Sequence, residues 1–141
     1  MNQQLLAEKV AARLLETDEF SKWLGIEVVE IKPGYSKVKM KIRSEMLNGF
    51  KICHGGVIFS IADSAFAFAS NSHGRLAVAI ETSIAFPASV KEGDELTAVA
   101  EEQSLRNSIA VYNVLVVNQS GEKIGIFRGT VYRTKDEYFP N

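Results

Sequence analysis

Residues 53–72, CHGGVIFSIADSAFAFASNS, decide the fold of this chain. They predict one long helix that is apolar on nearly every side and begins at the turn formed by His54, Gly55 and Gly56. The helix carries a single ionisable side chain, that of Asp63. A carboxylate on such a helix loses solvation, so it must be paired, neutralised or used in chemistry.

Small and polar residues form one stripe along this helix. They follow one another at steps of four, three, four and three positions: Gly56, Ser60, Asp63, Ala67 and Ser70. An adjacent apolar face holds Phe59, Ala62, Phe66 and Ala69. The simplest interpretation of Asp63 is a side chain that points to solvent. The helix offers no solvated face for it, which favours an internal interface that faces a site.

The start of the helix supports a site. The first four N–H groups of a helix have no intrahelical partner, and the macrodipole adds partial positive charge there. The glycines allow a ligand to approach the backbone closely. Such a helix start can stabilise the oxyanion of a carbonyl under attack, with the N–H of Gly55 as donor.

The spacing of the two features predicts a dimer. Asp63 lies eight residues beyond Gly55, or about 12 Å along a helix axis. It therefore cannot reach an acyl carbon bound at its own helix start. A second copy of the helix, packed antiparallel, would bring Asp63 of one subunit near Gly55 of the other.

Composition narrows the class of protein. A chain of 141 residues predicts one domain, residues 1–141, with an ordinary core. A net charge of −1 argues against nucleic acid and anionic membranes as partners. One cysteine suits a reducing cytoplasm, and the sequence shows neither a signal peptide nor an apolar run that could span a membrane.

Periodicity predicts an α+β fold. An N-terminal helical segment, residues 1–24, holds a helix over 3–16 and a short second helix between Asp18 and Gly25. The predicted strands cover residues 26–32, 35–43, 76–86, 95–102, 109–118 and 123–133, with a loop over 44–53 and a frayed polar tail over 135–141. Short connections require antiparallel pairing, so we expect one curved six-stranded antiparallel sheet wrapped around the long central helix.

Other chemistry is less well supported. Cys53 and His54 are adjacent in an extended segment, so their side chains point apart and do not form a nucleophile and base. The two histidines, His54 and His73, lack the carboxylate spacing of a metal site, and we expect no metal. His54 also has a structural interpretation, because its side chain can bond to the nearby backbone.

Several motifs together resemble the hotdog-fold acyl-CoA thioesterases of the phenylacetic-acid-degradation (PaaI) type. The resemblance covers almost the whole chain from about residue 20. It rests on segments 24–26 (LGI), 47–49 (LNG), 53–56 (CHGG), 62–63 (AD), 69–72 (ASNS), 93–94 (GD) and 127–129 (FRG). It implies a homodimer, or a dimer of dimers, that hydrolyses acyl-CoA without metal or bound cofactor, CoA being part of the substrate.

The resemblance also assigns roles. Asp63 becomes the catalytic carboxylate, the Gly55 N–H the oxyanion donor, and Asn48 and His54 polar residues at the thioester. The chain departs from its relatives where they place a hydroxyl or carboxylate for the attacking water. Ala67 and Ala79 stand at those positions, with Ser64, Thr82 and Ser83 only nearby, so that role is unassigned.

Substrate contacts are predicted at three places. The first place is beside the catalytic residues, where we expect substrate contacts from Gly56, Thr82 and Ser83. Three aromatic rings fit either an acyl pocket for an aromatic or medium-length group or ordinary core packing: Phe50, Phe59 and Phe66. Residues of a polar turn are candidates to meet the phosphates of CoA: Arg106, Asn107 and Ser108.

Two other functions are compatible with the same residues. A hotdog hydratase or dehydratase would use His54 and Asp63 as acid and base across the dimer. The Pro-rich histidine loop of dehydratases and the spacing typical of hydratases are both missing. A non-catalytic acyl-CoA binding module would keep the pocket but lose the nucleophile, and Asp63 argues against it.

Overall fold

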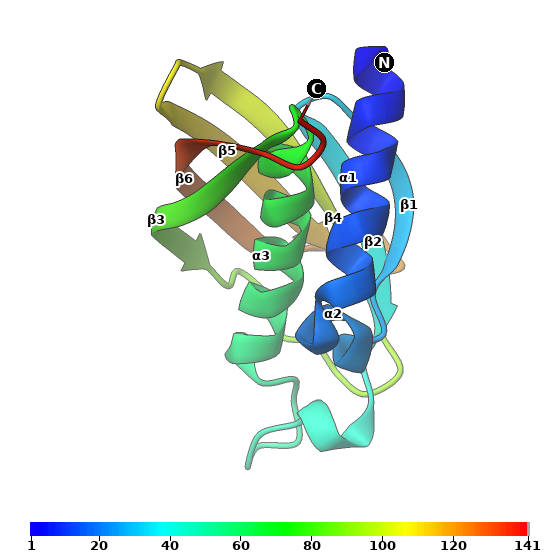
Figure 1. The fold of residues 1–141 in the computed structure, drawn as a ribbon. Helices are drawn as coiled ribbons and strands as arrows, with labels where there is room; N and C mark the ends of the chain where they lie inside the picture. The colour runs from blue at the N-terminus through cyan, green and yellow to red at the C-terminus, as the bar shows by residue number, and fades with distance from the viewer. Residues whose placement is uncertain (141) are drawn as a thin grey trace.

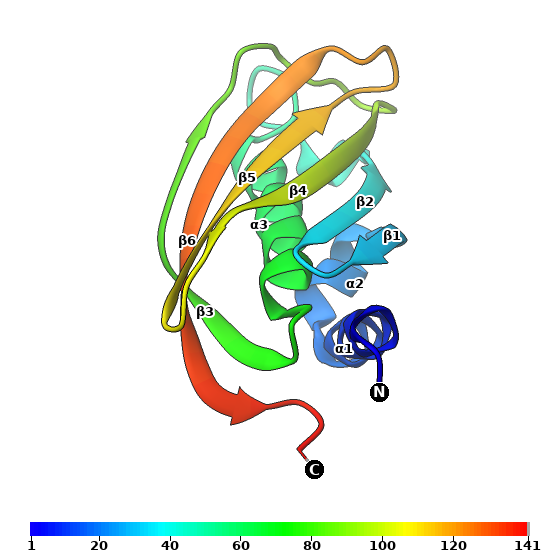
Figure 2. The same ribbon diagram turned by 90° about the horizontal axis from the view of Figure 1, so that it is seen from above.

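The helix predicted from residues 53–72 is α3 (Gly55–Asn71), and it lies in the hollow of a curved sheet (Figures 1 and 2). The computed structural model describes residues 1–140. The sheet has six strands in the order β1-β2-β4-β5-β6-β3, and every neighbouring pair is antiparallel. The strands are β1 (Glu27–Lys32), β2 (Tyr35–Lys41), β3 (Arg75–Ala85), β4 (Glu95–Leu105), β5 (Ile109–Val117) and β6 (Lys123–Glu137). The predicted hotdog arrangement is confirmed.

Two helices precede the sheet, as predicted. α1 (Gln3–Thr17) begins where the side chain of Asn2 accepts a hydrogen bond from the N–H of Leu5. α2 (Glu19–Leu24) is capped by Asp18 and ends before Gly25, whose φ of 80° favours glycine. Both helices lie on the same side of α3, beside β1 and β2 (Figure 1).

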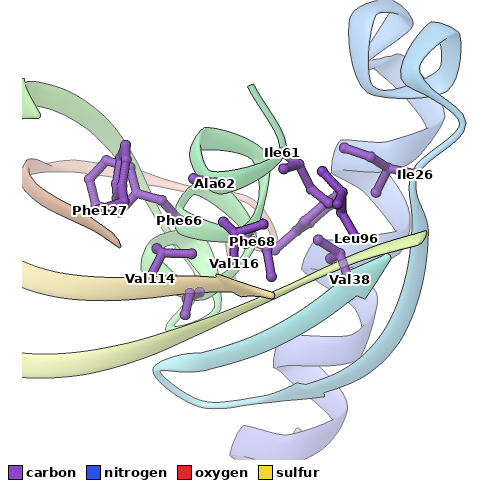
Figure 3. Close-up of a cluster of buried hydrophobic side chains, with 14 of the residues drawn as sticks. Ile26, Val38, Ile61, Ala62, Phe66, Phe68, Leu96, Val114, Val116 and Phe127 are labelled. Carbon is purple, nitrogen blue, oxygen red and sulfur yellow. The ribbon is translucent and has the colours of Figure 1, made fainter. Parts of the chain in front are cut away.

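The core forms where α3 meets the concave face of the sheet (Figure 3). The ring of Phe66 lies 5.4 Å from that of Phe127 and 5.8 Å from that of Tyr112. Two glycines of β6 make room for α3. A Cβ on Gly129 would come within 2.6 Å of Phe66, and one on Gly125 within 3.0 Å of Ile58.

A bulge in β3 decides which side chains face α3. The pairing with β6 shifts between Ala79 and Glu81. After the shift, Thr82 pairs with Gly129 and so lies on the concave face, whereas Ser83 pairs with Arg128 on the outer face. Without the bulge, strict alternation from Ala79 would have turned these two residues the other way.

The C-terminal segment corrects one expectation. The tail over 135–141 was expected to be frayed, but β6 continues to Glu137. The hydroxyl of Tyr138 then donates to Asn71 Oδ1 at 2.7 Å, and its N–H donates to the carbonyl of Gly74. These bonds anchor the segment to the end of α3; Asn141 lies outside the described residues.

Gly129→Ala tests the seating of α3 on β6. The new methyl group would overlap the ring of Phe66, so the free energy of unfolding should fall by about 1–3 kcal/mol in urea titration. Gly49→Ala is the control, because a Cβ there meets nothing within 4 Å. Adding Phe66→Leu should recover part of the loss; equal stability of both single variants would contradict this packing.

Candidate active site

The N-terminus of α3 leaves one backbone N–H without an acceptor. His54 is the N-cap, and its Nδ1 accepts from the N–H of Gly56 at 3.4 Å. The N–H of Val57 donates to the carbonyl of His54 at 3.0 Å. Within residues 1–140, no group accepts from the N–H of Gly55. The structure thus distinguishes the two glycines: Gly56 completes the cap, and Gly55 is free to bind a ligand oxygen.

The loop before α3 places Asn48 beside this N–H. Asn48 Oδ1 accepts from the N–H of Phe50 at 2.8 Å and from that of Ile52 at 3.4 Å. The carboxamide oxygen is therefore committed to the loop, and the amide NH₂ is the group that remains to meet a ligand. The backbone of His54 is held by the same loop, since its main-chain N–H donates to the carbonyl of Met46.

A pocket of about 360 Å³ opens at this end of α3. Asn48 and Gly55 belong to its lining, together with the segment that follows β3 and with Ile52, Cys53 and Ile58. Phe86, from that segment, lies outside the residues that the sequence predicts for the site. The only feature of the sequence that points to Phe86 is Pro87. A proline cannot continue the pairing of β3, so it places Phe86 just beyond the end of the strand.

Asp63 lies on the face of α3 that its own sheet leaves uncovered. Gly56, Ser60, Asp63 and Ala67 all retain exposure, whereas Ser70, the last residue of the predicted stripe, is buried. Burial raises the pKa of the Asp63 carboxyl, and the negative charge of Asp18 raises it further. The carboxylate is therefore partly desolvated and more basic than an ordinary aspartate.

Ser64 is already committed to a structural role. Its Oγ lies 2.8 Å from Ser21 Oγ, which donates to Asp18 Oδ2 at 2.6 Å. This buried chain of hydrogen bonds joins α3 to the start of α2. Ser64 therefore offers no hydroxyl for an attacking water, and the side chains of Ala67 and Ala79 have none.

The three predicted aromatic residues occupy different environments. Phe66 is buried in the core with 1% of its surface exposed, and it is not part of the lining of the pocket at the start of α3. Phe59 is half-buried and packs on Phe127, with 5.6 Å between ring centroids. Phe50 is 84% exposed, in the loop before α3.

The remaining predicted contacts lie away from the start of α3. Ser83 faces a hollow on the outer surface of the sheet, so within one chain it is not beside Gly55. Arg106, Asn107 and Ser108 form the turn between β4 and β5, at the opposite end of α3 from its N-terminus (Figure 1). Arg75 and Arg133 hold that turn through its carbonyl oxygens.

Neither thiol chemistry nor a metal site is favoured here. Cys53 is buried, and burial raises the pKa of its thiol to about 11, with a further rise from the charge of Asp94. The thiol is thus protonated at neutral pH and a poor nucleophile. Among residues 1–140, no group of three or more His, Cys, Asp or Glu is placed to hold a metal ion. No helix in that range is long and apolar enough to cross a membrane.

Comparison with known proteins places this geometry in context. Residues 50–124 match the model of the thioesterase superfamily. The chain is 40% identical to the Escherichia coli acyl-coenzyme A thioesterase PaaI over 123 residues, which cover 87% of this chain and 88% of that protein.

Solved structures agree with the family match. The E. coli PaaI protein from the phenylacetic acid degradation operon superimposes with a TM-score of 0.94 at 37% identity, over 96% of this chain and 99% of that one. A Streptococcus mutans protein bound to acetyl CoA superimposes with a TM-score of 0.77 at 27% identity, over 79% and 90% of the two chains.

Asp63→Asn should stabilise the fold while it removes the carboxylate. Because folding raises the pKa of Asp63, the ionised side chain destabilises the native state at pH values above that pKa. The variant should therefore melt at a higher temperature than the wild type at pH 7–8. The difference should disappear as the pH falls below the unfolded-state pKa of an aspartate, where both proteins carry a neutral side chain.

Asp136→Asn is the matched control, because its carboxylate is exposed on β6. Its melting temperature should follow that of the wild type across the same pH range. If Asp63→Asn were less stable than the wild type at pH 8, the prediction would be contradicted. That result would mean that contacts of the ionised carboxylate stabilise the native state by more than its burial destabilises it.

Proposed function

The chain belongs to the thioesterase superfamily, and we propose that it hydrolyses acyl-CoA thioesters, with an aromatic or medium-length acyl group, to the free acid and CoA. The observation that carries the proposal is the unpaired N–H of Gly55 at the start of α3, beside the amide of Asn48. Similarity to an acyl-CoA thioesterase and to a protein bound to acetyl CoA supports it.

In this proposal the thioester oxygen binds the Gly55 N–H. The positive end of the α3 dipole adds to this hydrogen bond, and both strengthen as the carbonyl becomes an oxyanion. Asn48 lines the same pocket, and its amide would act as a second donor. The side chain of His54 caps α3 by accepting a hydrogen bond from the backbone N–H of Gly56. We therefore do not give it the acid–base role that a hydratase would require.

Asp63 promotes attack on the acyl carbon in one of two ways. As a general base it takes a proton from water, whose oxygen bonds to the acyl carbon as the carbon–sulfur bond breaks. As a nucleophile it forms a mixed anhydride that water then hydrolyses. In both routes the sulfur leaves as the CoA thiolate, and the acid and the thiol are the final products. The raised pKa of Asp63 favours proton abstraction near neutral pH.

The active site requires a second subunit, because Asp63 and Gly55 are about 12 Å apart on one rigid helix. β3 is an edge strand with three exposed apolar side chains: Leu76, Val78 and Ile80. Such an edge pairs readily with its own copy. Antiparallel pairing about a two-fold axis would set the uncovered stripes of the two α3 helices side by side.

The same symmetry bears on the CoA phosphates. The β4–β5 turn lies at the far end of α3 within one subunit, so a two-fold axis brings it to the near end of the partner's helix. Arg106, Asn107 and Ser108 of one subunit would then contact the CoA phosphates at the Gly55 site of the other.

A dimer of dimers would use the outer face of the sheet, where Leu115 and Ile126 are exposed. A cytoplasmic location belongs to the same proposal.

Asp63→Asn should abolish most hydrolysis. Loss of a positioned base or nucleophile lowers kcat by about 10²–10⁴, and a near-isosteric side chain leaves KM almost unchanged. Thiol release from phenylacetyl-CoA and octanoyl-CoA measures the effect, with Asp136→Asn as control. Wild-type turnover by Asp63→Asn would remove this carboxylate from the chemistry. Binding without thiol release by the wild type would favour a binding module, and loss of enoyl absorbance would favour a hydratase.

Two inactive variants should restore activity in mixed dimers. Gly55→Pro removes the N–H yet suits the first helical position, and His54, at φ −62° and ψ 133°, already has the conformation that precedes proline. Refolding Gly55→Pro together with Asp63→Ala should recover about a quarter of wild-type sites under random pairing. Light scattering should give two or four chains per particle. Inactive mixed dimers, or a monomeric mass, would contradict a shared site.

A further inference from the structure

One wall of the pocket at the start of α3 is built from a residue far along the chain. Phe86 follows the last residue of β3, and it lines the pocket together with Pro87, Ala88 and Val90. The residue is 48% exposed, so it is only partly packed against the rest of the chain.

The tip of this ring lies directly over Gly55. A Cβ on Gly55 would be 3.3 Å from Phe86 Cζ and within 3.6 Å of both Cε atoms. The φ of Gly55 is not positive, so its backbone would accept any L residue. The constraint on a side chain at this position is therefore the ring of Phe86, against which a Cβ would press. The ring edge and the free N–H of Gly55 are immediate neighbours.

The chemistry of the lining indicates which part of a thioester enters this pocket. With the carbonyl on the Gly55 N–H, either the acyl group or the pantetheine arm extends along the wall. Phe86 and Pro87 are exposed and Ala88 is half-buried, and together they present an apolar surface on this side of the pocket. A pantetheine arm carries two amides that need hydrogen-bond partners, and along this wall only Ser89 has a polar side chain that could supply one. The acyl group is the part that fits.

Phe86 is also the wall residue that can change the size of the pocket. Ile58 is packed beneath α3 against Gly125 of β6, and Val90 is held where its carbonyl accepts from the N–H of Cys53. The other aromatic candidates do not line it, since Phe59 packs on Phe127 and Phe66 lies in the core. On the basis of the proposed function, we propose that Phe86 determines the length and shape of the acyl group that the enzyme accepts.

Phe86→Ala tests this role through a change in selectivity. Removing the ring lengthens the pocket beyond Gly55, so kcat/KM for dodecanoyl-CoA relative to butyryl-CoA should rise at least about tenfold, because even one methylene in an apolar pocket is worth 10–200-fold. Phenylacetyl-CoA, which would stack on the ring, should lose activity. Phe86→Leu should give an intermediate ratio and serves if the alanine variant is unstable.

The control variant is Phe20→Ala, which removes an exposed ring on α2 that stacks on Trp23 outside the pocket. Its selectivity should match that of the wild type. A ratio within about twofold of wild type in Phe86→Ala, too small to reflect one methylene, would overturn the proposal. So would an equal rise in KM for every acyl group, since that result assigns the wall to the pantetheine arm. If the wild type hydrolyses none of these thioesters, it is the proposed function that fails.

A second experiment tests whether the effects of substitutions at Phe86 and Gly55 depend on each other. Gly55→Ala keeps the N–H and adds only the methyl group that meets Phe86, so its loss of activity should be largely reversed by Phe86→Ala in the double variant. Additive losses in the double variant would show that Phe86 does not control access to the Gly55 N–H.

Discussion

The seating of α3 on β6 is the contact on which the rest of the structure depends. At Gly125 and Gly129 the strand presents bare backbone, and side chains of α3 occupy the space that Cβ atoms would fill. Close contact of this kind fixes the rotation of α3 about its own axis. It therefore also fixes which residues face away from the sheet, and these form the stripe that contains Asp63. The placement of the catalytic candidate is thus a consequence of core packing.

That placement has an energetic cost that the core must offset. The stripe is neither fully solvated nor covered by the chain's own sheet, and Asp18 adds a like charge nearby. A helix selected for stability alone would carry a neutral residue at position 63. The same desolvation that weakens the fold makes the carboxylate a better base, which is the exchange expected of a functional residue.

Features with a local cause could be predicted from the sequence, and those with a remote cause could not. Alternation, helical spacing and short connections are local, so the elements, the antiparallel sheet and the stripe follow from them. Phe59 and Phe66 share one predicted face, and contacts with residues more than 40 positions away, such as Tyr112 and Gly129, place Phe66 in the core. The bulge in β3, which turns Thr82 inward, and the anchoring of the C-terminal segment likewise depend on distant partners.

The backbone N–H groups at the start of α3 can either be capped within the chain or bind a ligand. A cap that satisfied every N–H would stabilise the helix further and leave nothing for a carbonyl oxygen. His54 satisfies the second N–H through its side chain and the third through its carbonyl, and so the first remains. Gly55 and Asp63 lie on a single rigid helix that keeps them about 12 Å apart. In the proposed site each chain would therefore carry two half-sites, and only association with another copy would join a donor to a carboxylate. The interface would then be part of the catalytic apparatus, and its stability would limit activity directly.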